Sequence, residues 1–177
     1  MSKPIQIPSL ETERLVLRGP EPGDFALYRD FYATATGEGG YGGPLRPDEA
    51  FRRLAADLGH WHLRGFGKWI VCLRDSGEPV GGCGLWHPVG WPSHELTWWL
   101  LPGARGKGYA AEASRAVIDH ALGELRWDHV ETHLRDTNDA ARKLAERLGG
   151  EVIRRETFPD GVTRNVYKVG ERQNDDA

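Results

Sequence analysis

Two glycines and two basic residues stand together in the middle of the chain, directly before an apolar helical pattern. In order, the segment is Arg105-Gly106-Lys107-Gly108-Tyr109-Ala110. Glycines let the backbone bend so that consecutive N–H groups can point at one spot, and a helix start adds unpaired donors and a positive dipole end. The segment therefore predicts an anion site suited to a phosphate or pyrophosphate. The alternative is an ordinary glycine turn with solvated basic residues.

Two common phosphate-binding motifs fit this segment less well. A P-loop needs Gly-Lys followed by Ser or Thr, whereas Lys107 is followed by Gly108 and Tyr109. The dinucleotide fingerprint is matched more closely, by Gly106-x-Gly108-x-x-Ala111. That fingerprint belongs to a first βα unit with further crossovers downstream, but here the chain soon ends in a hairpin pattern.

The elements around this loop predict an α+β domain with a mainly antiparallel sheet. Alternating or continuously apolar stretches predict seven strands, over residues 12–18, 68–74, 79–86, 94–101, 129–134, 151–158 and 162–169. A short helix follows the first strand, and Phe51, Leu54 and Trp61 give the next helix a buried stripe. Further helices are expected over 109–125 and after Asn138. The order is a strand, two helices, a three-stranded meander, helix, strand, helix and hairpin.

The chain has 177 residues, of which 39% are hydrophobic and 28% charged, enough for one domain of ordinary size. We expect a single domain over 1–177, with a core from about 10 to 169 and a frayed polar tail over 170–177. Neither a signal peptide nor the roughly 20-residue apolar run of a membrane span is visible, so a cytoplasmic protein with reduced, buried Cys72 and Cys83 is expected. The cysteine spacing predicts no metal site, and the net charge of −3 argues against nucleic acid as a partner.

Four stretches, in order along the chain, resemble a known family. Arg105-x-x-Gly108-x-Ala110 resembles the coenzyme A signature of the GCN5-related N-acetyltransferases (the GNAT superfamily), which reads Arg/Gln-x-x-Gly-x-Gly/Ala. Residues 11–18, 95–100 and 138–149 resemble its RimJ/RimL-type branch of ribosomal-protein N-acetyltransferases. The resemblance implies a mixed, mainly antiparallel seven-stranded sheet flanked by about four helices and splayed in the middle for coenzyme A. It also implies acetyl-coenzyme A as co-substrate, without a metal.

The resemblance assigns residues to the cofactor. Backbone N–H groups of the loop from Arg105 to Ala110 would bind the pyrophosphate. Leu100 and Leu101 would pair with the pantetheine arm, where their strand parts from its parallel neighbour over 129–134. Asn138 would hydrogen-bond the cofactor near the thioester; a plain helix cap is the alternative, and both can hold together.

The chain departs from the family pattern after Asn138. Many members carry Ser three residues later and many relatives a proton-donating Tyr seven residues later, where this chain has Ala141 and Ala145. The usual acid is therefore missing. This departure suggests a second hypothesis, a catalytically weak acyl-coenzyme A-binding protein of the same fold.

Acetyl transfer to an amine needs a proton acceptor, because a lysine-like ammonium has a pKa of about 10.4. Glu95 resembles the acidic residue that many relatives carry on this strand, and alternation places it on one face with Thr97 and Trp99. A solvated Glu at a strand start is the alternative. His94, on the opposite face, is the weaker candidate for the base. A backbone N–H near Leu100 is expected to hold the developing oxyanion.

Loops 37–43 and 86–92 are expected to wall the acceptor site, since loops vary most between relatives. Tyr41, Trp86 and Trp91 in or beside these loops could stack on a cation or a sugar. The expected acceptor is a primary amine of a small molecule or of a protein N-terminus. The sequence does not choose between them, nor between a monomer and a homodimer.

Overall fold

The strands of the protein form two antiparallel sheets. The computed structural model describes residues 5–35 and 42–173. One sheet has five strands in the order β1-β2-β3-β4-β5, and the other has three in the order β6-β8-β7. The strands are β1 (Leu10–Glu11), β2 (Leu15–Arg18), β3 (Lys68–Leu73), β4 (Pro79–Trp86), β5 (Glu95–Leu100), β6 (His129–Leu134), β7 (Glu151–Thr157) and β8 (Thr163–Glu171).

The α+β class and the element order predicted from the sequence are confirmed, with a difference at the N-terminal strand. A strand was expected over 12–18, but Thr12 N donates to the carbonyl of Leu15 at 2.9 Å and closes a turn. Leu10–Glu11 then folds back on β2 as an additional strand. At the other end β8 runs to Glu171, so the polar tail begins later than residue 170.

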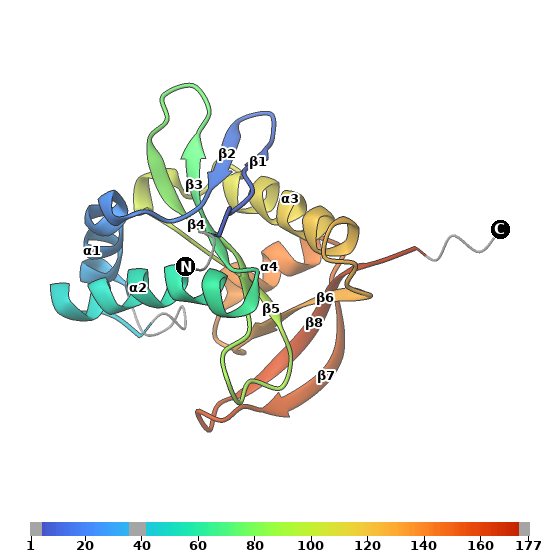
Figure 1. Cartoon of the computed structure of the whole chain (residues 1–177). Helices are drawn as coiled ribbons and strands as arrows, with labels where there is room; N and C mark the ends of the chain where they lie inside the picture. The colour runs from blue at the N-terminus through green and yellow to red at the C-terminus, as the bar shows by residue number, and fades with distance from the viewer. Residues whose placement is uncertain (1–4, 36–41, 174–177) are drawn as a thin grey trace.

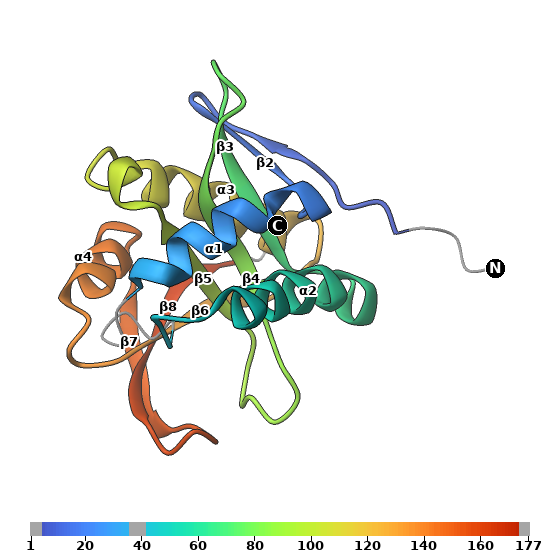
Figure 2. The ribbon, with the colours of Figure 1, turned by 90° about the vertical axis from the view of Figure 1, so that its left-hand side faces the viewer.

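Helices cover both faces of the five-stranded sheet. Figure 2 shows α1 (Phe25–Thr34) and α2 (Pro47–Arg64) in front of the strands and α3 (Tyr109–Gly123) behind them. The fourth helix, α4 (Asp139–Arg147), lies beside β6 (Figure 1). Trp99 packs against the rings of Tyr28 and Phe31 at centroid distances of 5.1 and 4.5 Å, which joins α1 to β5.

The buried side of α2 differs from the predicted stripe. Leu54 and Trp61 are buried, but Phe51 is 57% exposed, so its predicted burial was wrong. Asp57 lies on the buried side instead, where it accepts a hydrogen bond from the Tyr28 hydroxyl at 2.7 Å and pairs with Lys68 Nζ at 2.7 Å. A buried carboxylate is tolerated when it is paired and hydrogen-bonded, which apolar periodicity does not reveal.

The two sheets meet at β5 and β6 and then part. Thr132 Oγ1 donates to the Leu96 carbonyl at 2.9 Å and joins the strands near the start of β5. Towards the end of β5, Trp98, Trp99 and Leu100 instead face a cavity whose other wall includes α4. Cys72 and Cys83 are buried in the adjacent strands β3 and β4. Within the described residues, no helix is both long and apolar enough to cross a membrane.

Candidate active site

The cavity at the parting of the sheets has a volume of about 510 Å³. It combines the end of β5, the glycine loop and the start of α4. Most of the cofactor residues expected from the sequence line it, namely Leu100, Arg105, Gly106, Gly108, Tyr109, Ala110 and Asn138. Lys143 and Arg147 of α4 add further positive charge to the wall.

The loop before α3 has the conformation that its glycines predict. Gly106 and Gly108 have φ angles of 73° and 83°, in the left-handed region that favours glycine. Gly108 is the N-cap of α3 and, as a glycine, offers no side-chain acceptor to the first helical amides, those of Tyr109, Ala110 and Ala111. Those amides have no acceptor within the helix, so they and the helix dipole are available to an anion. A Cβ at Gly106 would meet open space, so a ligand can approach the bare backbone there. The loop therefore fits a pyrophosphate.

Arg14 supports the loop from the N-terminal hairpin. Its Nη1 donates to the carbonyl of Lys107 at 3.0 Å, and its Nε donates to Glu112 Oε2 at 2.7 Å. Glu112, in the first turn of α3, also accepts from the Thr12 hydroxyl at 2.6 Å. Burial raises the pKa of Glu112, but the hydrogen bonds from Thr12 and Arg14 outweigh it and the pKa lies below its usual value. Sequence reasoning did not assign this supporting role, although residues 11–18 were recognised as part of the family pattern.

The end of β5 presents one of its two predicted residues to the cavity. The Leu101 N–H donates to the Val80 carbonyl at 2.9 Å, so this amide is turned towards β4, and the pairing of Leu101 with a pantetheine arm stays a prediction. Since backbone groups alternate sides along a strand, the peptide groups of Leu100 face away from β4. The Leu100 carbonyl accepts from Arg105 Nε at 3.0 Å. Lys107 likewise lies outside the cavity lining given by the described residues.

Asn138 stands at the junction of two cavities. Its Oδ1 accepts from the Ala141 N–H at 3.1 Å, which confirms the helix-cap assignment for α4. The same residue also lines a second cavity of about 260 Å³. Asn138 is therefore a residue that both cavities share in their walls.

The second cavity brings together three residues expected at the acceptor site. Glu95, Trp86 and Trp91 line it, together with Thr97 and His133. Tyr41 lies outside the described residues. His94 points elsewhere: its Nε2 is 3.2 Å from the His129 carbonyl, and its ring lies 3.7 Å from that of Trp127.

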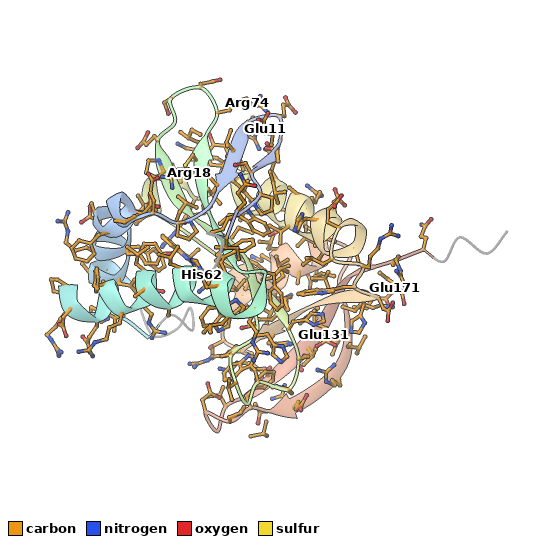
Figure 3. The ribbon with its side chains drawn as sticks, viewed as in Figure 1. Glu11, Arg18, His62, Arg74, Glu131 and Glu171 are labelled. Atoms are coloured by element: carbon orange, nitrogen blue, oxygen red, sulfur yellow. The ribbon has the colours of Figure 1, made fainter. Side chains whose placement is uncertain are left out.

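Glu95 is the more accessible end of a buried chain of charged groups. Its Oε2 lies 3.0 Å from His133 Nδ1, off the direction of the ring N–H, so the contact is electrostatic rather than a well-aligned hydrogen bond. On the other side of the imidazole, His133 Nε2 lies 3.3 Å from Glu131 Oε2. Glu131, on β6 (Figure 3), accepts two hydrogen bonds from Arg154 at 2.8 and 2.9 Å. Exposed fractions of the Glu95, Glu131 and His133 side chains are 15, 4 and 0%.

The two buried members of this group, Glu131 and His133, have pKa values shifted in opposite directions. Burial lowers the pKa of His133, but the hydrogen bond to Glu131 and the charges of Glu131 and Glu95 outweigh burial, and the pKa is raised. Burial raises the pKa of Glu131, but hydrogen bonds from His133 and Arg154 hold it well below its usual range. His133 and Glu131 were missed from the sequence: they stand two residues apart on β6, but Glu95 and Arg154, which they contact, lie far away along the chain. Among the described side chains, no group of three or more His, Cys, Asp or Glu could hold a metal ion.

The two tryptophan rings of the second cavity already contact other side chains of the protein. The His60 ring stacks on Trp86 at 4.5 Å, and Lys68 Nζ lies 4.3 Å from the centre of the Trp86 ring. The Arg164 guanidinium lies 5.5 Å from the centre of the Trp91 ring. The expectation that these tryptophans stack on a cation of the acceptor stays a prediction, and a cation of the protein itself already lies against each ring.

Comparison with known proteins identifies the class of this fold and site. The model of the family described as "Acetyltransferase (GNAT) domain" matches residues 14–151, most of the chain. The chain therefore belongs to the GNAT acetyltransferase family. The crystal structure of the acetyltransferase from Agrobacterium tumefaciens str. C58 is similar, with a TM-score of 0.83 and 34% identity, covering 95% of this chain and 97% of that chain.

More distant relatives extend the comparison. The uncharacterized N-acetyltransferase YnaD of Bacillus subtilis (strain 168) is 26% identical over 91 residues, 51% of this chain and 52% of that protein. This alignment spans about half the length of the curated relative. RimL, a ribosomal L7/L12 alpha-N-protein acetyltransferase solved in complex with coenzyme A, shares the fold with a TM-score of 0.69 at 13% identity, over 91% of this chain and 97% of that chain.

Proposed function

We propose that this protein transfers the acetyl group of acetyl-coenzyme A to a primary amine by direct attack. The observation that carries the proposal is the meeting of two cavities at Asn138. One is lined by the glycine loop before α3, which would bind the anionic cofactor, and the other by Glu95, whose carboxylate would accept a proton. Family membership supports the reaction class, since this is an acetyltransferase family.

The first cavity would hold the cofactor. The amides at the start of α3 and the bare backbone of Gly106 and Gly108 would bind the pyrophosphate, with Arg105 contributing charge. The cavity edge of Leu100 would face the pantetheine arm, and Asn138 would lie near its thioester end. When bound, acetyl-coenzyme A supplies an acetyl group on a thiol leaving group. RimL, which shares the fold, was solved with coenzyme A bound.

The second cavity would hold and deprotonate the amine. Glu95 would accept the proton, directly or through a water, and the charged chain of His133 and Glu131 would hold its carboxylate in place. A backbone N–H at Leu100 would stabilise the negative charge that develops on the thioester oxygen. Ala141 and Ala145 supply no acid, but a thiol with a pKa near 8.5 needs a proton only modestly on leaving.

Release of free thiol from acetyl-coenzyme A, measured across a panel of primary amines, tests this function. We expect thiol release that depends on both the amine and the enzyme, with a stoichiometric amount of N-acetylated amine identified by mass spectrometry. Binding of acetyl-coenzyme A without thiol release from any amine would contradict the proposal and favour the acyl-coenzyme A-binding protein instead. Release without an amine would indicate thioester hydrolysis.

A further inference from the structure

The second cavity contains more permanent positive than negative charge. Four basic side chains line it, namely Arg53, Lys68, Arg135 and Arg164, against three carboxylates, Asp57, Glu95 and Asp160. His133 also lines the cavity and adds no negative charge, because an imidazole is either neutral or positively charged. Charges in a small, partly enclosed cavity interact more strongly than charges in bulk water. This composition therefore favours an acceptor that brings negative charge.

Two of the carboxylates are already committed to a cation. Asp57 pairs with Lys68 Nζ at 2.7 Å. Asp160 receives two hydrogen bonds from Arg164, at 2.8 and 2.5 Å, a bidentate arrangement typical of strong Arg–carboxylate pairs. Hydrogen bonding by Arg164 lowers the pKa of Asp160 to about 2, so this pair stays ionised at neutral pH.

Arg53 and Arg135 have no comparable partner among the described residues. Arg135 Nη2 lies 4.0 Å from Asp160, which Arg164 already occupies, and Arg135 Nε has no hydrogen-bond partner. Within the part of the chain that the structure describes, the Arg53 guanidinium forms no ion pair and lies 5.8 Å from the centre of the Tyr32 ring. A guanidinium matches the geometry of a carboxylate with two parallel N–H groups. The two arginines reach the cavity from different elements, Arg53 from α2 and Arg135 from the end of β6.

We propose that the acceptor is a small amine that also carries a free carboxylate, as an amino acid does. Glu95 faces its amine, and Arg135 and Arg53 recognise its carboxylate. A polyamine fits less well, because Lys68 and Arg164 already lie against the rings of Trp86 and Trp91, where a second positive charge would be placed. This inference rests on the proposed function and narrows its acceptor class.

Matched acceptors test the inference. Amino acids with increasing separation between amine and carboxylate are compared with their primary carboxamides and with diamines of equal length. Affinity is measured calorimetrically in the presence of coenzyme A, and thiol release is measured with acetyl-coenzyme A. We expect the best acid to exceed its carboxamide roughly ten- to hundredfold in affinity and in kcat/KM, as for one hydrogen bond between charged groups.

Variants at two arginines test whether the preference for acids over carboxamides arises in this cavity. Arg135→Gln is expected to reduce the acid-to-carboxamide ratio about tenfold or more, and Arg53→Gln to reduce it in the same direction. Arg115→Gln, on α3 and outside this cavity, removes the same charge and is expected to leave the ratio unchanged. Carboxamides or diamines that bind and react as well as the acids would overturn the acceptor class. An unchanged acid-to-carboxamide ratio in both cavity variants would overturn it too. In either case the proposed acetyl transfer would stand. Selective binding of acids without any thiol release would instead overturn the transfer and support the recognition site.

Discussion

Glu95 carries the proton-transfer step in the proposed reaction, so its replacement gives the sharpest prediction at the scale of a residue. Gln keeps the size and hydrogen bonding of the side chain but does not accept the proton. General bases contribute roughly 10²- to 10⁴-fold, so we expect Glu95→Gln to lower turnover by that order with coenzyme A affinity nearly unchanged. The loss is expected to shrink at high pH, where more acceptor amine is already neutral.

Steady-state kinetics between neutral and alkaline pH check this prediction. His94→Gln is the matched control, because His94 lies next to Glu95 in sequence but points away from the second cavity. A change below about threefold that does not depend on pH would contradict the role of Glu95. In that case a group other than Glu95 would deprotonate the amine.

His133 predicts a pH-dependent difference in stability. The imidazole lies between Glu95 and Glu131, and these carboxylates raise its pKa despite burial. A raised pKa means that the stabilising contribution is complete below the ordinary value of about 6.5 and is lost as the pH rises through the folded-state value. We therefore expect the melting temperature of the wild type to exceed that of His133→Gln most at mildly acidic pH, with the difference shrinking above neutrality.

Thermal melts of both proteins across this pH range measure the difference, and His62→Gln on the exposed side of α2 provides the control (Figure 3). A difference that stays constant with pH would show that His133 contributes packing alone. A difference that grows with pH would contradict the assigned charge.

Single residues of the site were predictable where local pattern decides their direction. Glu95 was placed on the correct face by alternation, because side chains in a strand point to opposite faces in turn. Its neighbour His133 was not predictable, since Glu95 and His133 meet only through the packing of β5 against β6. The contacts of the Trp86 ring were missed for the same reason: the His60 ring that stacks on it comes from α2, and the Lys68 cation comes from β3.

At the scale of elements, the loop before α3 gives a prediction about the cofactor. Gly108→Glu places a negative side chain where the pyrophosphate is expected, at a φ of 83° and beside the tip of Arg14. We expect affinity for coenzyme A to fall by at least about a hundredfold, while the fold survives with a loss of about 1–3 kcal/mol from backbone strain. Isothermal titration calorimetry measures the affinity, and chemical denaturation measures the stability.

Gly77→Glu separates the two effects. Gly77 has a φ of 71° in the turn between β3 and β4, and a Cβ there meets open space. This variant is expected to lose similar stability and keep its coenzyme A affinity. Normal coenzyme A binding by Gly108→Glu would mean that the loop is only a turn.

Elements were predicted well where one periodicity extends through them, and less well where a distant contact ends them. The helix expected over 109–125 is observed as Tyr109–Gly123, because its apolar spacing is regular. The strand expected over 12–18 begins later, since Glu112 of α3 holds Thr12 and Arg14 in the turn. The strand expected to reach Leu101 ends at Leu100, and a short turn over Pro102–Ala104 follows directly, although the Leu101 amide still bonds to Val80 of β4.

At the scale of the whole molecule, the division of the strands into two sheets creates the candidate site. The long-range ion pair between Glu11 and Arg74, 2.9 Å at the tip of the five-stranded sheet, joins segments distant in sequence (Figure 3). The parting of β5 from β6 followed from the family resemblance and not from periodicity. A strand pattern gives the faces of a strand but not the partner on each edge.

The central claim is that the cavity between the sheets binds acetyl-coenzyme A in the folded protein. A ligand that binds only the folded state stabilises it by about 2.7 kcal/mol at a concentration of one hundred times its Kd. For a domain of this size, that corresponds to a rise in melting temperature of roughly 5–10 °C. NADH, whose fingerprint the loop does not match, serves as the comparison.

Thermal unfolding of the wild type and of Gly108→Glu, titrated with acetyl-coenzyme A and with NADH, is therefore the most direct test. The predicted result is a concentration-dependent rise with acetyl-coenzyme A in the wild type that is lost in Gly108→Glu, and no rise with NADH in either protein. A rise with NADH and none with acetyl-coenzyme A would contradict the assigned cofactor. An equal rise with acetyl-coenzyme A in both proteins would place its binding site away from this loop.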